Sequence, residues 1–74
     1  MIIQDKMKLI GLIKKFNGKY GTIITKNNKI IDFDAKDISF NQNIETGDIV
    51  EFRLENKGYN IYIARNIQVI KNDK

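Results

Sequence analysis

The side chains that could do chemistry in this sequence are acids, lysines and a few aromatic rings. The 74 residues include no histidine and no cysteine. The commonest general base, the commonest metal ligand and the thiolate nucleophile are therefore all missing. No remaining side chain stands in a pattern that pairs a nucleophile with a base. We expect a protein that is not an enzyme and that carries no cofactor.

Asp32 and Asp34 come closest to a metal-binding or acid–base pair. They stand two residues apart in an alternating segment, so both side chains lie on one face of a strand. Two carboxylates without a third ligand or a nearby histidine do not make a metal site. The pair is expected to form a solubilising face, to contact a basic protein partner, or to pair with lysines across the sheet.

Lys14, Lys15 and Lys19 precede Tyr20 closely in the sequence, and such a cluster suits the binding of an anionic polymer. Lysines supply the sequence-independent part of nucleic-acid affinity, and an exposed tyrosine ring can stack on a base. The net charge of +4, from 13 basic and 9 acidic residues, mildly favours the same class of partner. In the alternative interpretation, the lysines form a solvated strand end and Tyr20 covers the end of the fold.

The elements that must position these residues are short strands with alternating or apolar patterns. Turn residues separate them, namely Asn27-Asn28, Thr46-Gly47-Asp48 and Asn56-Lys57-Gly58, where Gly58 is expected to have positive φ. In the last strand, Ile61, Ile63 and Ile67 are expected to point inward. An irregular connection with one helical turn is expected at 38–44. The five predicted strands lie at 8–17, 20–26, 30–34, 48–55 and 59–69.

Five short strands without a segment of helical period predict an all-β fold. Closure into a barrel removes the exposed edges that an open sheet of this size would have. The length fits a five-stranded antiparallel OB-type β-barrel best, and an SH3-like barrel is the next candidate. We expect one domain at 8–70, with an N-terminal extension at 1–7 and a tail at 71–74.

The hydrophobic runs and the first residues of the chain indicate where the protein is located. No apolar run reaches the ~20 residues that cross a bilayer. The first residues, MIIQDKMK, are too short and too polar for a signal peptide. We therefore expect a cytoplasmic monomer that does not bind membranes.

Four stretches of the chain together resemble the cold-shock domain, an OB barrel that binds single-stranded RNA and DNA. Residues 11–17, GLIKKFN, are similar to that family's opening G-x-V-K-W-F-N, and residues 20–23, YGTI, resemble the F-G-F-I of its first RNA-binding motif. Residues 46–52, TGDIVEF, are similar to its fourth strand, and residues 64–67, ARNI, resemble its closing A-x-N-V. The four stretches occur in the family's order and at roughly its spacing, but the loop between Asn17 and Tyr20 is about two residues shorter than in the family.

The departures from the family fall on its binding surface. Lys15 stands at the position of the family's tryptophan, and Thr22 stands at the second aromatic position of the first motif. Asp32 and Asp34 replace an outward phenylalanine and histidine. Losing three or four stacking platforms removes roughly 3–12 kcal/mol of gross stacking energy. The resemblance therefore implies weak, salt-sensitive binding of single-stranded RNA or DNA, and RNA is the expected ligand.

Two of the aromatic residues allow two interpretations each. Phe16 is either a core residue or a ligand contact, and Phe40 is either an exposed platform or a plug for the end of the barrel. The alternative function is an OB-fold protein–protein interaction module that has lost nucleic-acid binding. A ribosome-binding S1-like protein ranks lower because that family lacks the Phe-Asn…Tyr-Gly spacing. The expected nucleic-acid-binding residues are Lys14, Lys15, Phe16, Lys19, Tyr20, Thr22 and Phe40.

Overall fold

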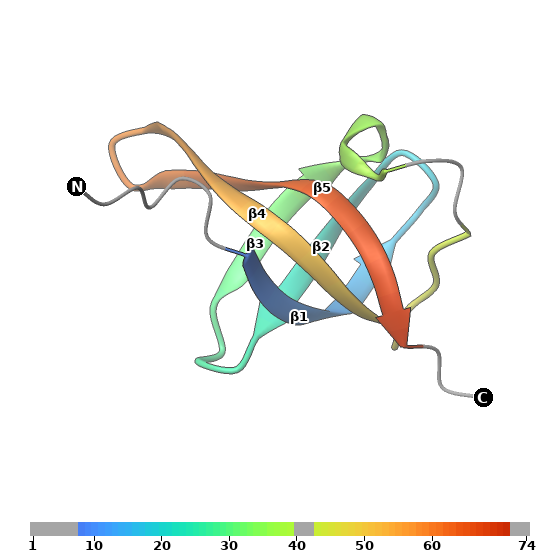
Figure 1. The fold of residues 1–74 in the computed structure, drawn as a ribbon. Coiled ribbons are helices and arrows are strands. Elements are labelled where there is room, and N and C mark those ends of the chain that lie inside the picture. The colour runs from blue at the N-terminus through green and yellow to red at the C-terminus, as the bar shows by residue number, and fades with distance from the viewer. Residues whose placement is uncertain (1–7, 40–42, 72–74) are drawn as a thin grey trace.

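The computed structural model describes residues 8–39 and 43–71 of the chain. Five strands make up most of this part, and one short 3-10 turn, η1, lies between the third and fourth strands (Figure 1). The elements are β1 (Lys8–Phe16), β2 (Tyr20–Thr25), β3 (Ile30–Asp34), η1 (Ala35–Asp37), β4 (Ile49–Gly58) and β5 (Ile61–Lys71).

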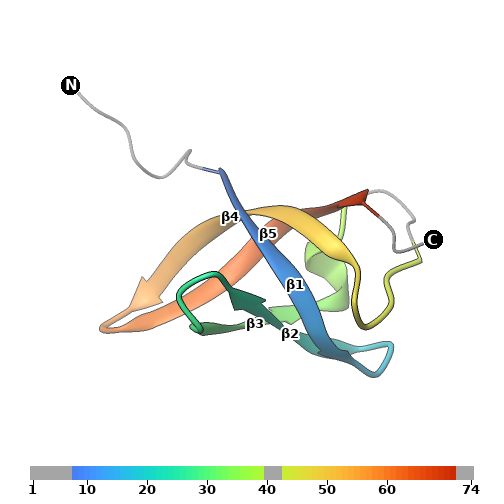
Figure 2. The ribbon, with the colours of Figure 1, turned by 90° about the horizontal axis from the view of Figure 1, so that it is seen from below.

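The strands close into a barrel in the order β1-β2-β3-β5-β4. Four of the neighbouring pairs are antiparallel, and β3 pairs with β5 in parallel through Asp32 and Ile63. Figure 2 shows the same barrel from below, with β1 crossing in front. The prediction of an all-β, five-stranded barrel of OB type is thereby confirmed.

The core of the barrel consists of alternate residues from all five strands. Phe52 of β4 is the largest fully buried side chain, and β1 and β2 each contribute one completely buried isoleucine. Such alternation is what a closed sheet with one inner face requires. The buried apolar residues are Ile13, Ile23, Ile31, Phe33, Ile44, Val50, Phe52, Ala64 and Ile67.

The connection between β4 and β5 differs from its prediction. β4 continues through Lys57 to Gly58, and the turn lies at Tyr59 and Asn60. Positive φ is found at Asn60 (58°), and Gly58 does not have it. The prediction placed the turn at the glycine. Asparagine also tolerates positive φ, however, and it takes that role here.

The inward residues of β5 were also partly mispredicted. Ile67 is buried as expected and Ile63 is half-buried, but Ile61 is 56% exposed. A register shift between Glu51 and Arg53 on β4 inserts one extra residue into β5, close to Asn66, whose φ is 52°. Such a bulge exchanges the inner and outer faces of the strand. Strict alternation therefore fails along β5.

Two other connections differ in detail from the sequence-based expectation. The β2–β3 loop is four residues long, 26–29, and Asn28 takes positive φ (64°) within it. The helical turn is η1 at Ala35–Asp37, which precedes the region expected to contain it. Within residues 8–39 and 43–71, no helical structure has the length and hydrophobicity that a membrane-spanning helix needs.

Candidate nucleic-acid interface

A β-bulge in β1 sets the directions of the first candidate residues. Ile13 pairs with Ile23, but the next pair along the ladder is Lys15 with Thr22. Lys14 is therefore the extra residue, and Lys14 and Lys15 are both exposed. Because a bulge shifts the phase of a strand by one residue, Phe16 turns toward the core.

Phe16 belongs both to the core and to the surface. Its ring stacks on Phe33 with a centroid distance of 5.5 Å and an interplanar angle of 27°. Gly21 lies between them in the sheet, since it is the register partner of each. A Cβ atom at Gly21 would come within 2.5 Å of Phe33 Cζ and of the Lys15 carbonyl oxygen. The absence of a side chain at this position thus allows the two rings to meet.

The turn between β1 and β2 is built on Asn17. Its Oδ1 atom accepts hydrogen bonds from the backbone N–H groups of Lys19 and Tyr20, each at 2.9 Å. The Asn17 N–H donates to the Tyr20 carbonyl oxygen at 3.1 Å, and Gly18 supplies a φ of 97°. The turn fixes the backbone of Tyr20, whose side chain is 60% exposed. The expected exposure of this ring is confirmed.

These residues line a shallow groove of about 630 Å³ at the β1–β2 end of the sheet. Of the expected site residues, Lys15, Phe16, Tyr20 and Thr22 line it together. Lys19 lies in the adjoining turn, Lys14 lies at the bulge outside the lining, and Phe40 falls outside the described residues. The complete lining is Lys15, Phe16, Asn17, Tyr20, Gly21, Thr22, Asp32 and Thr46.

Four lining residues were not part of the predicted site. Asn17 and Gly21 were quoted in the family resemblance, but the sequence did not show that they border a groove. Asp32 was singled out as a charged surface residue, and its strand and register could have placed it here. Thr46 comes from the long connection before β4, and the course of that connection is not readable from local sequence.

One row of side chains crosses the groove from strand to strand. Lys15 is the register partner of Thr22, and Thr22 is the register partner of Asp32. Directly opposed residues have Cβ atoms about 4.5–5.5 Å apart. A cation, a hydroxyl and a carboxylate therefore lie in line. The Thr22 Oγ1 atom is buried and has no hydrogen-bond partner among the described residues.

Asp34 does not form an open carboxylate pair with Asp32. Its Oδ1 atom accepts a hydrogen bond from the Lys36 N–H at 3.2 Å, and it caps η1. In return, Asp37 Oδ2 accepts from the Asp34 N–H at 3.1 Å, which completes a capping box. One member of the predicted pair is thus structural. Among the described residues, no group of three potential ligands is placed to hold a metal ion.

A scan against protein-family models and a search of curated proteins give no match to the chain. The interpretation of the groove rests on its own residues.

Proposed function

We propose that this protein binds single-stranded nucleic acid, with RNA as the expected ligand, in the manner of a cold-shock domain with reduced affinity. The observation that carries the proposal is the exposed ring of Tyr20 in a groove that Lys15 also lines. Lys19 directly precedes Tyr20 in the turn between β1 and β2. A stacking surface beside positive charge is the combination that single-strand-binding proteins use.

The same groove explains why binding should be weak. Its aromatic lining consists of the exposed Tyr20 and the half-buried Phe16, whose ring already stacks on Phe33. Each stacked base contributes about 1–3 kcal/mol. The carboxylate of Asp32 at the other side of the groove repels phosphates. The lysines must therefore supply much of the affinity, and added salt screens them.

Replacement of the stacking ring tests the proposal. Tyr20→Ala should weaken the binding of a labelled RNA of about eight nucleotides by roughly 5- to 150-fold, because one stacked base is lost. Fluorescence anisotropy at low salt measures the dissociation constant.

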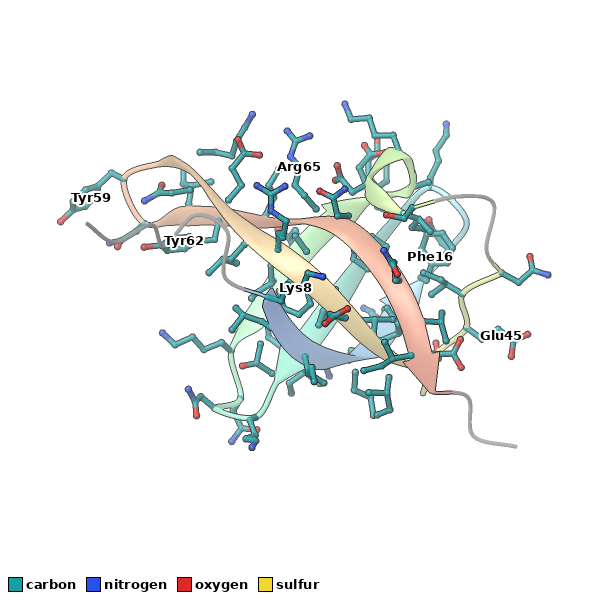
Figure 3. All side chains as sticks on the ribbon, in the orientation of Figure 1. Lys8, Phe16, Glu45, Tyr59, Tyr62 and Arg65 are labelled. Atoms are coloured by element: carbon teal, nitrogen blue, oxygen red, sulfur yellow. The ribbon has the colours of Figure 1, made fainter. Side chains whose placement is uncertain are left out.

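Tyr59→Ala is the matched control. Tyr59 is 91% exposed in the β4–β5 turn, and Figure 3 shows it at the opposite end of the barrel from Phe16. This variant should bind as the parent does. If Tyr20→Ala also binds with parental affinity, the groove is not the binding site.

A second candidate function is protein binding, which an aliphatic row on the outside of the barrel favours. Leu12 of β1 is the register partner of Ile49 on β4 and of Ile24 on β2, and Ile24 is in turn the partner of Ile30. Leu12 and Ile30 are exposed. Contiguous outward aliphatic residues are typical of interaction surfaces. If oligonucleotides fail to bind even at low salt, protein binding becomes the favoured function.

A further inference from the structure

Asp32 differs from its neighbouring aspartates because it has no structural task. Asp34 and Asp37 form the capping box of η1, and Asp48 Oδ2 accepts a hydrogen bond from the Glu45 N–H at 2.9 Å. Asp32 is exposed, and none of the described residues forms a hydrogen bond or an ion pair with its carboxylate. It nevertheless lines the groove that contains Tyr20.

The position of Asp32 relative to Tyr20 suits contact with the edge of a stacked base. Tyr20 and Thr22 point outward from the same face of β2, and Thr22 lies directly opposite Asp32. Lys15 lies opposite Thr22 on its other side. A base on the Tyr20 ring therefore extends its edge over a row that offers a carboxylate at one end and an ammonium group at the other.

We propose that Asp32 reads this base and selects guanine, an inference that rests on the proposed single-strand binding. The two oxygens of a carboxylate accept two parallel hydrogen bonds. Guanine presents two adjacent donors, N1–H and the N2 amino group, on the Watson–Crick edge that single-strand-binding proteins contact. Its O6 atom lies next to them and accepts a hydrogen bond from the Lys15 ammonium group.

The other bases complement the row less well. Uracil has a single N3–H donor between two carbonyl oxygens, and those oxygens repel a carboxylate. Cytosine and adenine each offer one amino group next to a ring nitrogen lone pair, which also faces the carboxylate unfavourably. A carboxylate that weakens phosphate binding in general thus becomes a source of discrimination between bases. A bidentate contact of this kind changes the preference by roughly tenfold.

Three RNAs with a single varied base test the inference on the intact chain. Oligouridylates of about eight nucleotides carry guanosine, inosine or uridine at one central position. Inosine keeps N1–H and O6 but lacks the 2-amino group. The parent protein should bind the guanosine RNA about ten times more tightly than the uridine RNA, with the inosine RNA between them.

Asp32→Asn separates base reading from simple repulsion. If Asp32 reads guanine, this variant loses most of the guanosine preference, while its affinity for the uridine RNA rises or stays the same. A parent protein that binds all three RNAs equally overturns the inference and leaves the proposed function intact. An equal gain for all three RNAs in Asp32→Asn, with the preference ratio kept, also overturns it. Failure of every RNA to bind at low salt contradicts the proposed function itself.

Discussion

At the scale of single residues, the groove depends on the absence of a side chain at Gly21. Phe16 from β1 and Phe33 from β3 can stack because no side chain stands between them on β2. Gly21 does not have positive φ, so glycine is not needed here for its backbone conformation. It is needed because neighbouring atoms occupy the space that a side chain would fill. Of the two stacked rings, Phe16 also lines the groove that contains Tyr20.

Gly21→Ala should lower the free energy of unfolding by about 1–3 kcal/mol, because the new methyl group overlaps the Phe33 ring and the Lys15 carbonyl oxygen. Urea denaturation followed by circular dichroism measures the change. Gly58→Ala is the control, since a Cβ atom there meets Ile61 Cδ1 at an ordinary 3.7 Å. It should leave the free energy unchanged or raise it by up to about 1 kcal/mol. Equal effects of the two substitutions would show that Gly21 has no packing role.

The residues that the sequence predicted best are those whose role is local. Tyr20 follows a short Asn-Gly-Lys turn, and its predicted exposure is confirmed. The double role of Phe16 could not be predicted, because it depends on a bulge and on Phe33, which is distant in the sequence. Asp34 was read as a surface charge. The residues after it form η1, and its side chain caps this turn, which local propensity does not predict.

At the scale of elements, η1 links β3 to β5, its neighbour in the barrel. Asp37, which is buried, forms an ion pair with Arg65 of β5 at 3.6 Å, and Arg65 also contacts Glu55 of β4. Figure 3 shows Arg65 on the outer surface beside β5. Because β3 and β5 share one pair of bridged residues, this contact strengthens a junction with few hydrogen bonds.

Asp34→Ala should lower the free energy of unfolding by about 1 kcal/mol, since the first turn of η1 loses its cap. Thermal or urea denaturation measures the loss. Asp32→Ala, a change of the same type two residues earlier on an exposed face, should stay within about 0.5 kcal/mol of the parent. A loss at Asp32 as large as that at Asp34 would contradict the assignment of structural and free carboxylates.

The strands were easier to predict than their connections. β3 has the predicted bounds because its alternation is unbroken between polar loops. The β4–β5 turn was misplaced, since both Gly58 and Asn60 suit a turn and the cross-strand register decides between them. The bulges in β1 and β5 were not predicted as such, because each depends on the strand beside it.

At the scale of the whole molecule, three lysines lie near one end of the barrel's sheet. The bulge in β1 keeps Lys14 and Lys15 exposed, and Lys19 follows in the adjoining turn. If these three lysines contact phosphates, the logarithm of the affinity for single-stranded RNA should fall with the logarithm of the salt concentration at a slope of about −2. This dependence separates binding at the lysines from a purely apolar contact.

The central claim is that single-stranded nucleic acid binds in the groove of Tyr20. The most direct measurement is a titration of the isotope-labelled protein with single-stranded RNA, followed by ¹H–¹⁵N NMR at low and moderate salt. We expect shifts that cluster on residues 14–22, with Asp32 among the affected residues, and that fade as salt is added. Spectra that do not change at low salt, or shifts confined to the β4–β5 turn, would contradict the claim.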